Sequence, residues 1–404
     1  MFNINMGGGL MQLVAYGAQD IYLTGNPQIT FFKVVYRRHT NFSMEAIQQT
    51  WNGAVSNGAR VTATISRNGD LVSKMYLQVG AAAITGAACA NAGYSMIDNV
   101  VLEIGGQQID KHNGHWLETY AELTVPNNNM VGMTQGVGDA NSALGTLFQL
   151  TTHTGGVFGS GSAASDVAHY VPFQFWFCRN PGLALPLIAL QYHEVKVILT
   201  FETVANGTTI DDSQDGGIAL WVDYIYLDTD ERRRFAQVSH EYLIEQVQHQ
   251  NSAAADSIDL NFNHPVKEVI WAGVGTGVGT ATSIATARSI TTGSKFSLKL
   301  NGHDRMAPRP LTYFTRCQVL DYHSGSGGML PKTLLNTFAD SIAVYSFALK
   351  PEEHQPSGTC NFSRIDNAQL VNTGTALAID LDIYAVNYNV LRIMSGMGGL
   401  AYSN

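Results

Sequence analysis

Short apolar runs separated by turn residues recur along the whole chain, and they are the feature that most restricts its fold. Alternating or apolar runs of this length are typical of β-strands. Many such strands in succession are typical of a β-sandwich. The runs in the first half of the chain are residues 31–36, 61–65, 75–79, 100–104 and 195–201. The pattern restarts in the second half with residues 258–262, 268–271, 296–300, 343–349 and 379–386.

Length and composition agree with two all-β domains. A chain of 404 residues is too long for one ordinary core and fits two domains of roughly 200 residues each. With 45% hydrophobic and 14% charged residues, it has enough apolar surface to bury. Forty glycines, together with many β-branched residues, favour short strands and turns over long helices.

Two hairpins indicate that the second half repeats the first. Residues 100–104 alternate and end at Gly105-Gly106, and residues 296–300 alternate and end at Asn301-Gly302. Both pairs suit a primed turn, which needs positive φ at its two central residues. We therefore interpret the chain as a duplicated domain.

Charge and turn residues place the domain boundaries. Each half ends in a related strand, at residues 223–230 and 382–389, and the first is followed by a charged segment unsuited to a core. The opening segment is rich in glycine and polar residues. The expected organisation is an N-terminal arm at residues 1–26, a first domain at 27–230, a linker at 231–242 and a second domain at 243–404.

Several classes of function are disfavoured. The net charge is −9 and no run of Lys or Arg supplies the basic surface that a phosphate backbone requires. The first 16 residues lack the basic start of a signal peptide, and the longest mostly apolar run, residues 183–190, is too short to span a bilayer. The four cysteines form no CxxC pair, so we expect reduced thiols made in a cytosol-like compartment.

Four weakly hydrophobic inserts separate the strands. Connections this long usually lie at the surface, and we expect them to form outward tips. The glycine run at residues 273–280 lacks the Gly-Lys-Ser/Thr ending of a phosphate-binding loop, so it is interpreted as an ordinary loop. The inserts are residues 80–93, 151–169, 206–217 and 273–293.

His112, His115 and Glu118 are the one group whose spacing suggests a metal site. The two histidines are three residues apart, so on a strand they would face opposite sides. A metal centre would need a further ligand from a later strand, and none is apparent. A polar patch at the surface or between subunits is the favoured interpretation, and we expect no metal and no cofactor.

Enzymatic activity is not indicated either. The sequence has no Gly-x-Ser-x-Gly elbow, no HExxH motif and no recognisable carboxylate pair. Three Asn-x-Ser/Thr acceptors occur, at Asn41, Asn206 and Asn361. Without a secretory signal they are expected to be unmodified, with Asn206 the most accessible and the other two structural.

Two basic clusters are candidate clamps between subunits or domains. Arg37 and Arg38 follow an apolar run, and Arg232, Arg233 and Arg234 lie in the expected linker. Clusters of this size usually form salt bridges or solvated edges. Arginine also serves buried and interfacial pairing, which makes a clamp the alternative in a protein that assembles.

Five blocks across the chain resemble one family. GLMQLVAYGAQDIYLTGNPQITFFK at residues 9–33 and SRNGDL at 66–71 are similar to the major capsid proteins of nucleocytoplasmic large DNA viruses, with the algal-virus type nearest. The same holds for PGLALPLIALQYHEV, QPSGTCNFSRIDN and NYNVLRIMSGMGGLAY, at residues 181–195, 355–367 and 387–402. The resemblance spans both halves and both termini.

The resemblance implies two tandem jelly-roll sandwiches and a structural role in a virion. It implies a homotrimeric capsomer of pseudo-hexagonal outline that tiles an icosahedral outer shell around an internal membrane, assembled in the host cytoplasm. Expected partners are other copies, neighbouring capsomers, minor capsid proteins and a penton protein, without direct contact to nucleic acid. The Ala/Gly/Thr/Ser-rich inserts depart from the family pattern, which bears on outer-surface decoration.

Two other functions stay open on the residues alone. A carbohydrate-binding or carbohydrate-processing double jelly roll would need aromatic platforms or carboxylates on one concave face. A minor or penton-type shell protein would differ in its copy number.

Overall fold

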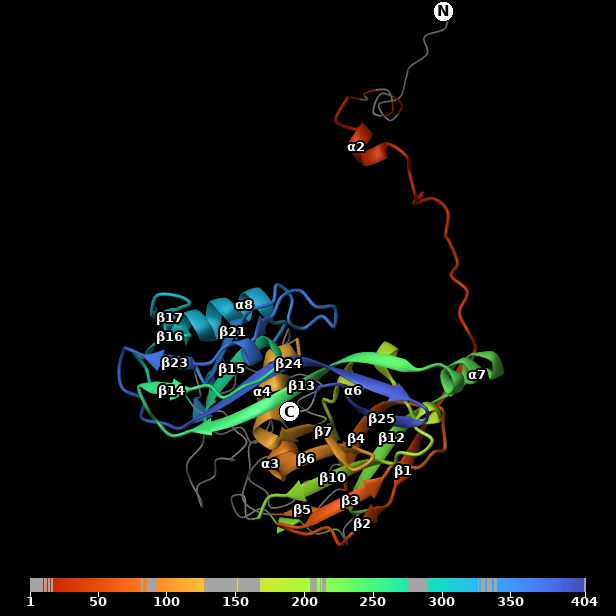
Figure 1. Cartoon of the computed structure of the whole chain (residues 1–404), viewed down its shortest axis with the longest axis horizontal. Helices are drawn as coiled ribbons and strands as arrows, with labels where there is room; N and C mark the ends of the chain where they lie inside the picture. The colour runs from red at the N-terminus through yellow and green to blue at the C-terminus, as the bar shows by residue number, and fades with distance from the viewer. Residues whose placement is uncertain are drawn as a thin grey trace, which may run out of the picture. The chain divides into compact units, whose positions relative to one another are not determined.

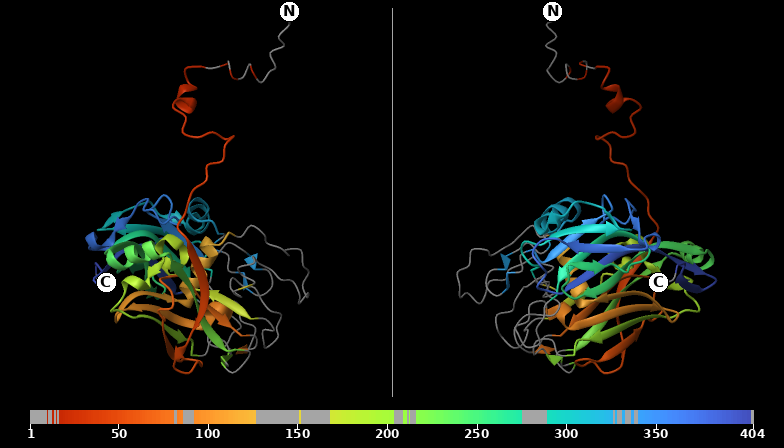
Figure 2. Two further views of the ribbon diagram at one scale, coloured as in Figure 1. Left: turned by 90° about the vertical axis from the view of Figure 1, so that its right-hand side faces the viewer. Right: turned by 60° about the vertical axis from the view of Figure 1, so that its left-hand side comes forward.

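The chain divides into two compact units, Met1–Asn41 and Phe42–Asn404. The computed structural model describes residues 10, 13, 15, 17–80, 83–85, 92–126, 151, 168–203, 209–210, 212, 216–274, 289–325, 327, 331–332, 336–337 and 340–402. Figure 1 labels the helices and strands, and Figure 2 gives two further views.

The N-terminal unit contains the short helix α2 (Ile21–Thr24), preceded by a turn in which the Gly17 N–H donates to Asp20 Oδ2 at 2.7 Å. The prediction of a strand at residues 31–36 is wrong. These residues form a turn and irregular backbone, and Phe31 and Phe32 are 89% and 98% exposed. A strand needs a ladder partner, and residues 31–36 have none among the described residues.

The first sandwich is built from two antiparallel sheets. One has the order β1-β12-β4-β8, with β9 beside β4, and the other has the order β2-β3-β10-β6-β7. A small sheet pairs β5 with β11. The strands are β1 (Phe42–Gln49), β2 (Trp51–Asn52), β3 (Arg60–Thr64), β4 (Leu71–Val79), β5 (Ile84–Thr85), β6 (Ile97–Ile104), β7 (Gln107–Asn113), β8 (His169–Pro172), β9 (Leu185–Pro186), β10 (Val195–Phe201), β11 (Thr209–Ile210) and β12 (Ile218–Leu227).

The second sandwich repeats this plan. One sheet has the order β13-β24-β15-β21, with β22 and β25 attached, and the other has β14-β23-β16-β17, with β18 attached; β19 pairs with β20. The strands are β13 (His240–Ser252), β14 (Ser257–Asp259), β15 (Pro265–Gly273), β16 (Lys295–Leu300), β17 (His303–Asp304), β18 (Arg309–Pro310), β19 (Pro331–Lys332), β20 (Asn336–Thr337), β21 (Ile342–Ser346), β22 (Cys360–Asn361), β23 (Ala368–Asn372), β24 (Leu381–Met394) and β25 (Met397–Leu400).

The duplication predicted from the hairpins is confirmed. In each sandwich the first strand pairs with the last long strand, which in turn pairs with a central strand: β1-β12-β4 corresponds to β13-β24-β15. The two hairpins, β6–β7 and β16–β17, occupy equivalent places in the opposite sheets. Gly105, Gly106, Asn301 and Gly302 all have positive φ, as a primed turn requires.

Short helices connect the strands. The charged segment after β12 forms the helix α7 (Thr229–Gln237), which buries no residue, and β13 is the next element. Its Asp228 N-cap accepts from the Thr229 N–H at 2.8 Å. The others are α3 (Ala92–Ser95), α4 (Gly114–Thr124), α6 (Trp176–Arg179), α8 (Gln318–Tyr322) and the tighter or wider turns Pro181–Leu183, Leu187–Ala189, Tyr313–Cys317 and Phe362–Arg364.

The sheet β13-β24-β15-β21 is buried on both faces. Along β24, Ile383 and Ala385 pack in the core of the second sandwich, whereas Tyr384 and Val386 belong to the core that includes the first sandwich. The same alternation occurs in β15, where Trp271 faces one core and Ile270 the other. One hydrophobic core therefore runs from the first sandwich into the second. Figure 2 shows the sheets of the two sandwiches lying in adjacent layers.

Most of each predicted insert lies outside the described residues, including residues 86–91, 152–167, 204–208 and 275–288. Their expected position at outward tips therefore stays a prediction. In the part of the chain that the structure describes, no helix is both long enough and apolar enough to cross a membrane.

The β6–β7 turn provides a matched pair of glycine substitutions. A Cβ on Gly106 would meet no atom within 4 Å, so Gly106→Ala is expected to cost about 1–2 kcal/mol, for its positive φ alone. A Cβ on Gly105 would lie 2.3 Å from His193 Nδ1, the atom that lies 2.9 Å from Gly398 O in the second sandwich. Gly105→Ala is expected to cost roughly 1 kcal/mol more, for that hydrogen bond. Urea unfolding midpoints measure the difference; equal costs would show that the His193 contact contributes nothing.

Candidate functional site

Among the described residues, three groups of buried charged and polar side chains lie where the two sandwiches meet. The face of β13-β24-β15-β21 that is turned away from its own sandwich packs against α4, α6 and β7 of the first sandwich. Trp116 of α4 lies 5.0 Å, between ring centroids, from Tyr384 of β24. The Gln246 side chain also donates to the backbone carbonyl of Ile109. Within this apolar contact, polar residues form three clusters.

The Asp382 cluster joins β24 to the start of α4. His115 Nδ1 lies 2.8 Å from Asp382 Oδ2, and His249 Nε2 lies 2.9 Å from Asp382 Oδ1. The Tyr384 hydroxyl donates to Asn113 Oδ1, the N-cap of α4, at 3.2 Å. Burial raises the pKa of Asp382, but the hydrogen bonds and charges of His115 and His249 outweigh it and hold that pKa far below its usual range.

The Glu245 cluster places one carboxylate between two cations. Arg179 of α6 contacts Glu245 Oε2 at 2.8 Å, and Lys267 of β15 contacts Glu245 Oε1 at 2.9 Å. Lys267 is 2% exposed and also donates to the Pro351 carbonyl at 2.6 Å. Arg179 also donates to the Tyr120 hydroxyl of α4 at 3.0 Å. Burial raises the pKa of Glu245, whereas the neighbouring Arg179 and Lys267 lower it, with a net lowering.

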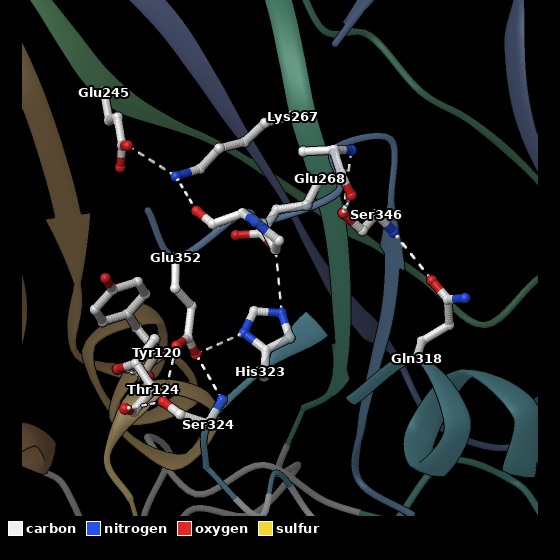
Figure 3. Close-up of polar contacts among 12 residues, drawn as sticks. Tyr120, Thr124, Glu245, Lys267, Glu268, Gln318, His323, Ser324, Ser346 and Glu352 are labelled. Atoms are coloured by element: carbon white, nitrogen blue, oxygen red, sulfur yellow. Dashed lines mark hydrogen bonds and ion pairs between the residues drawn. The ribbon is translucent and has the colours of Figure 1, made fainter. Parts of the chain in front are cut away.

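The His323 cluster places a histidine between two carboxylates (Figure 3). His323 Nε2 lies 3.1 Å from Glu268 Oε2, and His323 Nδ1 lies 3.2 Å from Glu352 Oε1. Burial lowers the pKa of His323, but the charges and hydrogen bonds of Glu268 and Glu352 outweigh it and raise the pKa to about 9. Ser324 then links the cluster to the first sandwich, since its hydroxyl lies 2.8 Å from both Thr124 O and Glu352 Oε2.

These clusters are suited to fixing geometry. A buried charge that loses its partner costs several kcal/mol, so any sliding of one sandwich against the other would carry that cost. Each of the three clusters contains residues from both sandwiches. The arrangement therefore locks the relative position of the two sandwiches within the unit Phe42–Asn404.

The residues considered for a metal site are divided between two contacts. His112 Nε2 lies 2.9 Å from Asp110 Oδ2, and the His112 ring stacks on Phe175. His115 instead contacts Asp382, and Glu118 is buried in α4. Among the described residues, no group of three His, Cys, Asp or Glu side chains is arranged to hold a metal ion. The expected polar patch at the surface or between subunits is wrong for both histidines, because His112 and His115 are buried within the chain, at 1% and 5% exposed.

The Asn-x-Ser/Thr acceptors differ in their surroundings. Asn361 accepts from the Ser363 N–H at 3.0 Å and caps the turn Phe362–Arg364, which gives it a structural contact. Asn41 is exposed at the end of the N-terminal unit. Asn206 lies outside the described residues.

The arginines considered as clamps lie in two different parts of the chain. Arg232 of α7 contacts the buried Asp70 of the first sandwich at 3.0 Å. Arg233 and Arg234 are exposed on the same helix, and Arg37 and Arg38 are exposed in the N-terminal unit. The salt bridge of Arg232 therefore lies within one chain, between α7 and the first sandwich.

The three clusters were not predicted from the sequence. One signal was present: Lys267 and Glu268 are charged residues inside the apolar run of β15, and Asp382 opens the apolar run of β24. Charges at such positions need buried partners. Their partners come from distant segments, such as Arg179 and His323, and no local pattern identifies them.

Comparison with known proteins assigns the chain to a family. Residues 30–228 match the family described as "Major capsid protein N-terminus", and residues 231–399 match "Large eukaryotic DNA virus major capsid protein". The major capsid protein of Pyramimonas orientalis virus is 52% identical, covering 99% of this chain and 100% of the relative. That of Paramecium bursaria Chlorella virus 1 is 41% identical over the same shares of the two chains.

Solved structures agree. PBCV-1 VP54, whose crystal structure was fitted into a reconstruction of the virophage Sputnik, is 38% identical, with a TM-score of 0.72 over 93% of this chain and 100% of that one. The Faustovirus major capsid protein shares the fold at 14% identity, with a TM-score of 0.68 over 96% of each chain. The duplicated sandwich topology, the two matched halves and the full-length relatives together show that this chain belongs to the major capsid proteins of large eukaryotic DNA viruses, with a double jelly-roll fold.

Proposed function

We propose that three copies of this chain close into a capsomer of pseudo-hexagonal outline, and that such capsomers tile the icosahedral outer shell of a large double-stranded DNA virus. The family membership makes the chain a structural component of a virion capsid, and not an enzyme. The proposal concerns how copies of the chain assemble.

The observation that carries the proposal is the duplication within a locked unit. Two sandwiches of equivalent topology supply two of the six sides of a hexagon-like outline, so three copies complete it. That outline persists only if the two sandwiches keep a fixed relation to each other. The continuous core and the three clusters provide that fixed relation.

A closed ring of three also requires heterologous contacts, in which one face of a copy meets a different face of the next. The two sandwiches differ in sequence although they share topology, so their flanks are unlike. Neighbouring capsomers, minor capsid proteins and a penton protein are the further partners of such a shell. Residues 1–26 would lie on the inner side of the shell and contact neighbouring capsomers or minor capsid proteins. The shell would enclose an internal membrane and be assembled in the host cytoplasm.

The exposed arginines fit the same scheme. Arg37, Arg38, Arg233 and Arg234 are available for contacts between copies, whereas Arg232 already contacts Asp70. The domain boundaries that suit this scheme are those expected above, with an arm at 1–26, sandwiches at 27–230 and 243–404, and 231–242 between them. Asn41, Asn206 and Asn361 are expected to carry no glycan.

The oligomeric state tests the proposal directly. Light scattering on the purified chain should give three times the subunit mass of 43.7 kDa, and negative-stain images should show hexagon-like particles. A stable monomer, or a particle with a two-fold outline, would rule out the trimer.

The Glu245 cluster should be essential for stability. Glu245→Gln leaves Arg179 and Lys267 without their counter-charge, so the free energy of unfolding should fall by roughly 3–5 kcal/mol. The control is Glu241→Gln on the same strand, whose contact with Arg392 is exposed and whose loss should cost less than about 0.5 kcal/mol. Urea denaturation of the two variants provides the comparison, and equal effects would mean that the buried cluster contributes no more than a surface pair.

The His323 cluster should make stability depend on pH. Because the pKa of His323 is raised in the folded state, to about 9, its contribution is complete below about pH 6.5 and is lost as pH rises from there through 9. The shift corresponds to about 3 kcal/mol, at about 1.4 kcal/mol per pKa unit. Unfolding free energies measured across this range should fall for the wild type and much less for His323→Gln. The same fall in both proteins would exclude His323 as its source.

A further inference from the structure

The strand β1 lies at one edge of its sheet. It pairs with β12 along its whole length, in an unbroken register from Phe42 to Gln49, and β12 is its one ladder partner among the described strands. Six of its eight side chains are exposed, including Phe42 at 54% and Met44 at 52%. A long and partly apolar edge without a bulge is a template for another strand.

The usual means of protecting such an edge are missing from β1. Its sequence FSMEAIQQ has no Lys, no Pro and no bulge, and Glu45 is its one charged residue. The opposite edge strand of the same sheet, β8, is four residues long and ends at Pro172. The β1 edge therefore resembles an acceptor site more than a protected border.

The N-terminal unit contains a segment that fits such an acceptor. Residues 29–36, with the sequence ITFFKVVY, are rich in the β-branched and aromatic residues that favour strands. Six of these residues, all large and hydrophobic, are between 68% and 98% exposed: Ile29, Phe31, Phe32, Val34, Val35 and Tyr36. The segment has eight residues, as does β1.

We propose that residues 29–36 of one copy add as a strand to the free edge of β1 in a second copy of the same chain. Main-chain hydrogen bonds would supply the affinity, and the alternating side chains would supply the register. The inference rests on the proposed trimer and names a contact within it.

Two observations favour a second copy over the chain's own arm. Folding back onto its own β1 would require a turn at residues 37–41, but in RRHTN only Asn41, directly before β1, is a turn-favouring residue, and there is no Gly or Pro. Exchange between copies also closes in a ring, because every copy offers one donor segment and one acceptor edge.

The charges of the donor segment and the acceptor strand are complementary, since Lys33 is the one charged residue of the segment and Glu45 that of β1.

A cross-linking experiment on the full-length chain tests the contact. A benzophenone amino acid replaces Phe32 in one version, and a co-expressed second version with another tag carries Ser43→Thr, which changes the mass of the β1 peptide. After irradiation of purified trimers, mass spectrometry should find the probe joined to the heavier β1 peptide, which comes from the second version. Cross-links confined to the unmodified β1 peptide would indicate a hairpin within one chain, and cross-links elsewhere would also overturn the proposal.

A proline substitution tests whether the strand supports the trimer. Val34→Pro removes a backbone N–H and disrupts pairing, so the concentration at which trimers dissociate should rise at least about tenfold. Gln28→Pro lies outside the segment and should change it less than about twofold, as should deletion of residues 1–26. An unchanged trimer in Val34→Pro would contradict the inference, whereas a monomeric wild type would instead defeat the proposed trimer.

Discussion

The structure depends on one sheet, β13-β24-β15-β21, being buried on both of its faces. An antiparallel sheet often has one face in water, but here one face packs in the second sandwich and the other against the first. This double burial explains why Lys267, Glu268 and Asp382 all have closely placed polar partners, since an unpaired charge at such a place would cost several kcal/mol.

An intact buried ion pair adds little net stability, because much of its attraction offsets the loss of hydration, whereas separating its partners is costly. That distinction suits a capsid subunit. The attraction between the apolar faces is non-directional and changes little if one sandwich shifts slightly against the other. Contacts such as His115 to Asp382 and Arg179 to Glu245 form only at hydrogen-bonding distance, and therefore in only one relative position of the sandwiches. The interface therefore combines a large non-directional attraction with a few directional contacts that fix how the sandwiches are oriented.

The sequence predicted the parts of the fold that have local causes. Positive φ at Gly105 and Gly302 follows from turn chemistry, and the alternation of residues 100–104 follows from a strand with one buried face. Residues 31–36 have the same local pattern but form no strand in this chain, because a strand also needs a partner. The pairing of His323 with Glu268, between residues distant in sequence, likewise depends on the assembled tertiary structure, so no local motif predicts it.

The duplicated domains use equivalent sheets in different ways. In the second sandwich the long strand β24 is buried at nine consecutive residues, from Leu381 to Asn389. In the first sandwich the outer side of the equivalent sheet includes the exposed Lys74 of β4 and the half-buried Trp221 and Asp223 of β12, beside the largely exposed β1. A gene duplication followed by docking of one sandwich on the other would produce this asymmetry. One copy of the sheet then serves contacts within the chain, and the other is left for contacts between chains.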